Sequence, residues 1–189
     1  MSDFEKELLY HAAPSLSGMK QANLFSFPLE QLPQFRDEVG QYQKKLASVG
    51  IALLYLYCCR KRIFLLVYRE KELNTYLKQP QVQELLMTHG YPSPSQADFL
   101  TQTLLHLRKR ISAYQEFPHE IGFFLGYPVE DVLNFIQQKG QNYKICGYWK
   151  VYGDVSEALR IFASYELCRT QMMEQVQRGV SLFSLLQAS

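Results

Sequence analysis

The chain has 189 residues, of which 47% are hydrophobic and 20% charged, and its formal net charge at pH 7 is +2. Such a chain is long enough to bury a hydrophobic core, and no low-complexity segment or repeat divides it. A net charge this small gives no support to binding of nucleic acid or of an anionic membrane surface. We therefore expect a single domain over residues 1–189, with neither nucleic acid nor a membrane as its partner.

The four cysteines and the first residues indicate a cytoplasmic protein. Cys58 and Cys59 are adjacent and no C-x-x-C pair occurs, so the spacing fits neither a disulfide framework nor a zinc site. The first residues, MSDFEKELLYHAAP, lack the apolar core of a signal sequence, and no apolar run approaches the roughly 20 residues of a membrane span. We expect a reducing compartment, no metal and no cofactor.

The first fifty residues predict a helix, a strand and a second helix. A short helix is expected over 2–10, then a loop, HAAPSLSGMKQAN, and a brief strand over 23–27. Apolar side chains then recur at steps of three and four, as in an amphipathic helix. These are Phe35, Val39, Tyr42, Leu46 and Val49. Gly50 is a suitable stop, because a helix C-terminus often needs a left-handed residue.

A β-hairpin is predicted next. Residues 51–59 and 63–69 are apolar, β-branched and aromatic, and the short basic stretch 60–62 separates them. Both faces of each strand are apolar, so we expect the hairpin in the middle of a covered sheet. There Cys58 and Cys59 would behave as small apolar side chains.

Helices dominate the second half of the chain. Short helices are expected over 73–77 and 82–87, a longer one carries Phe99 to Tyr114 after an N-cap at Ser95, and another covers 129–138. Residues 143–152 are expected to form the last strand.

A long helix is expected to close the fold. Asp154 caps it, and Glu157 three residues on nearly completes a capping box. The apolar tail after Gly179 is expected to dock on the body or on a partner, which is also consistent with a homodimer.

These elements predict an α+β fold. We expect a mostly antiparallel four-stranded sheet with a central hairpin, flanked by helices. The order of elements is compatible with a ferredoxin-like split β-α-β plan with inserted helices.

Candidate ligand-binding residues lie on the expected last strand, since side chains alternate between the faces of a strand. Tyr148, Lys150 and Tyr152 would share one face with Lys144 and Cys146, and this mixed row suits an anionic or aromatic ligand. The alternative is an edge strand whose lysines discourage aggregation.

Three further residues are candidates for chemistry. His119 and Glu120 are the best acid–base candidates by residue type, although neighbours in extended structure point apart and no H-E-x-x-H spacing occurs. Lys20 lies in a loop of small and polar residues that favours an anion, without the P-loop pattern. The alternative for each of these three residues is a purely structural role without chemistry. The Arg-Lys-Arg triplets at 60–62 and 108–110 are typical of solvated surface charge.

The strings FPHEIGFFLGYPVEDV and GYWKVYGD resemble DUF3793, a domain of unknown function common in anaerobic Gram-positive bacteria. The likeness is most specific over 118–168, and HAAPSLSGMKQANLF resembles the family's N-terminal block. The family has no established activity, so the resemblance implies no catalytic roles. Asn134 stands where a Gly is usual and Ala12 where a Cys is frequent, which argues against a mechanism that needs a thiol in the N-terminal loop.

Two functional hypotheses follow. The first is a non-catalytic cytoplasmic binding module for a small anionic or aromatic ligand, or for a protein partner, in which Lys20, Tyr148, Lys150 and Tyr152 bind. The second is a small-molecule enzyme that uses His119 or Glu120 as acid or base. In it, Lys20 or Lys150 stabilises an anion. Both suppose that the N-terminal loop, the His119 turn and the last strand converge on one concave site.

Overall fold

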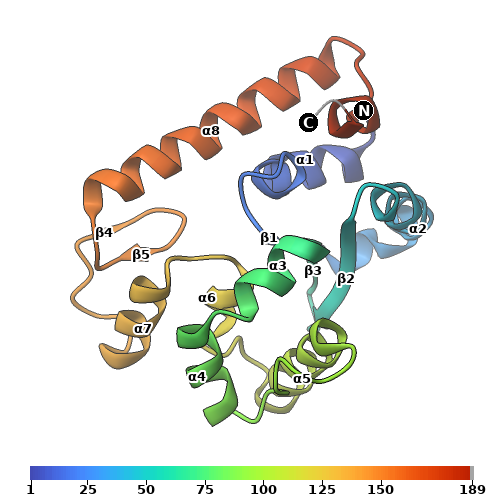
Figure 1. Cartoon of the computed structure of the whole chain (residues 1–189). Helices are drawn as coiled ribbons and strands as arrows, with labels where there is room; N and C mark the ends of the chain where they lie inside the picture. The colour runs from blue at the N-terminus through green and yellow to red at the C-terminus, as the bar shows by residue number, and fades with distance from the viewer. Residues whose placement is uncertain (188–189) are drawn as a thin grey trace. The chain divides into compact units, whose positions relative to one another are not determined.

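The computed structural model describes residues 1–187 (Figure 1). The chain divides into two compact units. Unit 1 comprises residues 1–71 and the C-terminal segment from residue 165, and unit 2 comprises residues 72–164. The single domain expected from the sequence stays a prediction, which a single cooperative unfolding transition would support. Within residues 1–187, no helix combines the length and the apolar character needed to cross a membrane.

Unit 1 is built on a three-stranded antiparallel sheet in the order β1-β3-β2. The strands are β1 (Ala22–Pro28), β2 (Ile51–Cys58) and β3 (Arg62–Arg69). β1 and β2 are joined through α2 (Leu32–Ala47) and run parallel on either side of β3, which is the split β-α-β arrangement. The predicted four-stranded sheet is not formed within the described residues. β3 alone is central, so β2 is an edge strand.

The helices of unit 1 follow from apolar periodicity and caps. α1 (Asp3–Leu16) begins after Ser2, whose Oγ accepts the N–H of Glu5 at 3.2 Å. It runs well past the predicted end at residue 10 and includes Pro14, because Ala12, Ala13 and Leu16 are fully buried. That burial outweighs the hydrogen bond lost at the proline.

Arg69 of β3 closes the C-terminus of α1. Its Nε donates to the carbonyl of Ser15 at 2.8 Å and its Nη2 to that of Leu16 at 2.6 Å. The chain then turns at Gly18, which has a φ of 85°, and a Cβ there would touch the Arg69 guanidinium. The N-terminal loop is thus tied to the sheet.

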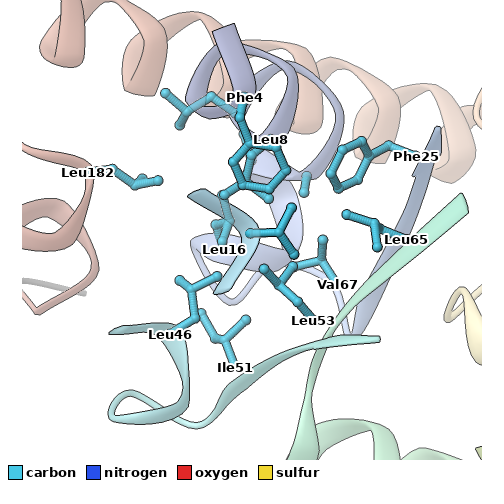
Figure 2. Close-up of a cluster of buried hydrophobic side chains, with 14 of the residues drawn as sticks. Phe4, Leu8, Leu16, Phe25, Leu46, Ile51, Leu53, Leu65, Val67 and Leu182 are labelled. Atoms are coloured by element: carbon cyan, nitrogen blue, oxygen red, sulfur yellow. The ribbon is translucent and has the colours of Figure 1, made fainter. Parts of the chain in front are cut away.

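The core of unit 1 lies between one face of the sheet and its helices (Figure 2). Phe4 and Leu8 of α1 lie against Phe25, Leu65 and Leu53 of the three strands. A short 3-10 turn, η1 (Leu29–Gln31), leads into α2. The last helix, α9 (Leu182–Gln187), buries Leu182 and Leu186 in the same core, so the apolar tail docks on the body as expected.

Unit 2 is mostly helical. Its helices are α3 (Glu70–Leu77), which begins in unit 1, α4 (Pro80–Thr88), α5 (Phe99–Tyr114), α6 (Ile121–Phe124) and α7 (Val129–Gln137). α8 (Val155–Gln177) supplies residues to both units and begins after Asp154, whose Oδ1 accepts the N–H of Glu157 at 3.1 Å, as the capping pattern predicts. α5 begins after Asp98 rather than Ser95, and α6 was not expected from the sequence.

The prediction of a single strand over residues 143–152 is wrong. The segment folds back on itself as a small hairpin of β4 (Ile145–Cys146) and β5 (Lys150–Val151), which pair only with each other. The reversal at residues 147–149 lets Trp149 become buried, with 7% of its surface exposed. Alternation along one strand therefore does not decide which of these side chains share a face.

Candidate functional site

Asp131 of α7 holds the segment that follows β5. Its Oδ2 accepts the indole N–H of Trp149 at 2.6 Å, and its Oδ1 accepts the backbone N–H groups of Tyr152 at 2.7 Å and Gly153 at 2.8 Å. The residue is only 5% exposed. A buried carboxylate with three charge-assisted hydrogen bonds fixes the position of Trp149 firmly. We call Asp131 and these three hydrogen bonds the Asp131 clamp.

A cavity of about 350 Å³ lies beside this clamp, entirely within unit 2. It is lined by the turn before α6, one side of α7 and the β4–β5 hairpin. Most of its wall is aromatic or apolar. The aromatic side chains are Phe117, Tyr127, Phe135, Tyr148 and Trp149. This size and lining are typical of a small-molecule pocket.

Three side chains with nucleophilic or proton-transferring groups line this pocket, which we call the aromatic pocket. Cys146 and Lys150 are directly opposite each other in the β4–β5 pair, so their side chains leave the same face. The Lys150 Nζ donates to the carbonyl of Gly140 at 2.8 Å and lies 4.7 Å from the centre of the Tyr143 ring. His119 lies edge-on to Phe135, with ring centres 5.2 Å apart. The lining thus adds an ammonium, an imidazole and a thiol, besides the Asp131 carboxylate, to walls that are mostly aromatic and apolar.

Two glycines let the walls of the pocket approach closely. A Cβ at Gly122 would lie 2.8 Å from Val132, and one at Gly147 would lie 2.3 Å from the ring of Phe162 on α8. Phe162 in turn packs edge-on against Trp149, with ring centres 4.6 Å apart. A side chain at position 147 would therefore displace Phe162 from its packing against Trp149.

We expect Gly147→Ala to lower the free energy of unfolding by about 1–3 kcal/mol, because the added methyl group overpacks Phe162. The emission of Trp149, the only tryptophan in the chain, should shift as its packing loosens. Gly153→Ala is the matched control, since its nearest neighbour would be 3.4 Å away. Urea unfolding followed by fluorescence checks both, and equal stability of the two variants would contradict the prediction.

A second cavity of about 250 Å³, with several ionisable residues in its lining, shares Phe117, Pro118 and His119 with the first. Glu120 lies on its wall and is 2% exposed. The Glu120 Oε1 accepts the Arg110 Nε–H at 2.7 Å and the Tyr91 hydroxyl at 3.1 Å. Burial is the main cause, and the Glu120 charge a further one, of a raised pKa at Tyr91. Glu120 is thus the buried carboxylate of an ion pair whose arginine side chain is partly exposed.

The sequence model for DUF3793, described as a protein of unknown function, matches residues 8–186. The chain belongs to the DUF3793 family. Neither the curated proteins nor the solved structures contain a match to it.

The candidate site residues of this DUF3793 protein fall into two groups. His119, Tyr148 and Lys150 line the aromatic pocket together. Tyr152 does not line it: the residue is 7% exposed, and its backbone N–H, not its ring, is what Asp131 holds. Burial raises the pKa of the Tyr152 hydroxyl, for which residues 1–187 provide no hydrogen-bond partner.

Lys20 of this DUF3793 protein belongs to unit 1 and is 4% exposed. Its Nζ lies 5.9 Å from the centre of the Tyr165 ring, and burial lowers its pKa from 10.5 to about 7. It is not among the residues of the aromatic pocket. The convergence of Lys20 with His119 and Lys150 on one site therefore stays a prediction.

Asp131 is the residue that sequence reasoning missed. Its place in the first turn of a helix explains a carboxylate there by the helix dipole alone. Its partners lie 18 to 22 residues later, and only the fold brings them together.

Within residues 1–187, no set of three His, Cys, Asp or Glu side chains is arranged to hold a metal ion. The expectation that Cys58 and Cys59 are covered side chains is wrong, since Cys58 is exposed and Cys59 partly exposed.

Proposed function

We propose that the aromatic pocket of unit 2 binds a small molecule with an aromatic or apolar body and an anionic group. The observation that carries this proposal is that Lys150 and His119 both line a half-open, largely aromatic pocket of about 350 Å³. Flat side chains favour stacking with a planar ligand. An ammonium at the edge of such a pocket favours a carboxylate, sulfonate or phosphate.

The Lys150 ammonium has donors to offer a ligand. An ammonium carries three N–H groups, and the carbonyl of Gly140 accepts from one of them. That bond and the Tyr143 ring hold the ammonium in place, so little entropy is lost when an anion binds. Asp131, which also lines the pocket, directs its oxygens to Trp149, Tyr152 and Gly153, and among the described residues it forms no ion pair with Lys150.

The test uses the position of Trp149, the chain's single tryptophan, in the pocket wall. We titrate the protein with 8-anilinonaphthalene-1-sulfonate, and in parallel with N-phenyl-1-naphthylamine, which has the same rings without the sulfonate. Both probes should quench Trp149 by energy transfer. In Lys150→Met, affinity for the sulfonate probe should fall about tenfold, while affinity for the neutral probe stays the same.

Lys144→Met is the matched control. Lys144 is exposed, lies outside the pocket lining and donates to the carbonyl of Gly153. Its loss should leave both affinities unchanged. Absence of Trp149 quenching, or equal loss of sulfonate binding in the two lysine variants, would contradict the proposal. Native mass spectrometry of the protein as purified from cells would show whether the retained species is a small molecule, a protein partner or a second copy of the chain.

Acid–base catalysis on a bound small molecule is the second candidate, because His119 lines both cavities. Glu120 is poorly suited to the role, since the residue is buried and its Oε1 accepts hydrogen bonds from both Arg110 and Tyr91. The variant His119→Gln distinguishes the two candidate functions. A binding module keeps its affinity for the retained molecule with no turnover in either form, whereas an enzyme keeps the affinity and loses turnover. We place either activity in the cytoplasm as part of the proposal.

A further inference from the structure

The second cavity of unit 2 brings a different set of charges within reach of the aromatic pocket. Residues 117–119 line both spaces. Arg110, Glu116 and Glu120 line only the second cavity, whereas Lys150 lines only the aromatic pocket. Because the two spaces have wall residues in common, one ligand can occupy both of them.

Glu120 offers the second cavity an acceptor for which the protein supplies no donor. The residue is 2% exposed, and its Oε1 accepts both the Arg110 Nε–H at 2.7 Å and the Tyr91 hydroxyl at 3.1 Å. Among residues 1–187, no hydrogen bond reaches its Oε2. A buried polar atom without a partner costs free energy, and most such atoms in folded proteins are hydrogen-bonded. Since Glu120 lines the cavity, a ligand there can supply the missing donor.

The charged residues of the second cavity favour a cation. Arg110 forms an ion pair with Glu120, which compensates its charge. Glu116 is exposed and adds a second carboxylate, and it forms no ion pair or hydrogen bond with the described part of the chain. With the imidazoles of His89 and His119 uncharged, the lining holds two carboxylates and one guanidinium. This excess of negative charge favours a positively charged group of the ligand.

An ammonium is the group that these side chains match. It carries three N–H donors and no acceptor, whereas a carboxylate only accepts. Hydrogen bonds between such charged groups are stronger than those between neutral ones. The rings of Tyr114 and Phe117 also line the cavity, and aromatic faces attract ammonium groups.

We propose that the ligand of the aromatic pocket is a small aromatic zwitterion, whose anionic group lies at Lys150 and whose ammonium lies in the second cavity. This inference rests on the proposed function and names the ligand class of the same site. The ammonium binds to Glu120 Oε2 and to Glu116. Because Lys150 is absent from the second cavity and both glutamates are absent from the aromatic pocket, the two charges lie at different ends of the ligand.

The experiment compares two probes that differ in one group. The first is 5-[(2-aminoethyl)amino]naphthalene-1-sulfonate, which joins a sulfonate, an aromatic body and an ammonium on a short arm. The second is its hydroxyethyl analogue, in which a hydroxyl group replaces the ammonium. Quenching of Trp149 by energy transfer measures both affinities. We expect the amino probe to bind about tenfold more tightly, and Lys150→Met to weaken both probes equally without changing this ratio.

Variants of the two glutamates locate the ammonium. Glu116→Gln should reduce the preference for the amino probe to about threefold and leave the affinity for the hydroxyl probe unchanged. Glu120→Gln should abolish the preference, because it also leaves the Arg110 charge uncompensated in the cavity. Glu84→Gln is the matched control: Glu84 is exposed on α4 and lines neither space, so the tenfold ratio should persist. Circular dichroism confirms that the variants are folded.

The outcomes separate this inference from the function on which it rests. Equal affinities for the two probes, with both weakened in Lys150→Met, would overturn the zwitterionic ligand and leave the proposed function standing. A preference for the amino probe that survives both Glu116→Gln and Glu120→Gln would overturn the placement of the ammonium. Absence of Trp149 quenching by either probe would overturn the proposed function and this inference together.

Discussion

Asp131→Ala should lower the free energy of unfolding by about 3–5 kcal/mol, the largest loss expected from a single change in unit 2. The substitution leaves the Trp149 indole N–H and the backbone N–H groups of Tyr152 and Gly153 without their acceptor. All three are donors at or near buried positions, so each carries a desolvation cost. The β4–β5 hairpin loses its attachment to α7, and the pocket loses one wall.

Urea unfolding and the emission maximum of Trp149 measure this effect, with a red shift expected as the indole meets water. Asp131→Asn should be intermediate, because its remaining carbonyl oxygen still accepts from the backbone while its amide opposes the indole donor. Asp154→Ala is the matched control: that carboxylate caps α8 through one exposed bond, so its loss should cost only about 1 kcal/mol. Equal costs for the alanine substitutions at Asp131 and Asp154 would show that the clamp does not hold unit 2 together.

The sequence was sufficient wherever a structural feature depends on nearby residues. The apolar steps from Phe35 to Leu46 predicted α2, and Gly50 ends the segment after it with a φ of 73°. The hairpin of β2 and β3 followed from two apolar runs and a short basic turn. Local propensity and local hydrogen bonds decide these elements, so periodicity was enough.

The sequence was insufficient where distant residues decide the outcome. Residues 143–152 have the composition of one strand, but the chain reverses at residues 147–149, and Trp149 donates to Asp131, 18 residues earlier. Glu120 has the chemistry of a general base, yet its carboxylate forms an ion pair with Arg110, ten residues earlier. His119, Tyr148 and Lys150 do line one pocket, although the single alternating strand from which two of them were chosen does not exist. Residue type selected these three side chains, and only the fold shows that they line one pocket; that they bind a ligand stays a prediction.

Lys20 should make the stability of the protein rise with pH above neutrality. Burial lowers its pKa from 10.5 to about 7, so between these two values the unfolded chain binds more protons than the folded one. The free energy of unfolding then increases with pH, by up to about 1.4 kcal/mol per pH unit. Between pH 7 and 9.5 the gain should be roughly 3 kcal/mol.

The comparison with Lys20→Met isolates this contribution. Cys59, whose pKa is also lowered, acts in the same direction but is present in both proteins. Buried tyrosines such as Tyr68, whose pKa is raised to about 12, act in the opposite direction from about pH 9, where the unfolded chain begins to lose its phenol protons, but they too are present in both proteins. Urea unfolding from pH 7 to 9.5 should therefore give a rising stability for the wild type and a flatter curve for the variant. The variant should be the more stable protein at pH 7, because methionine has no charge to desolvate. Parallel curves would mean that Lys20 is protonated in the folded protein throughout this range, and that it would then serve as a fixed cation rather than a neutral amine at physiological pH.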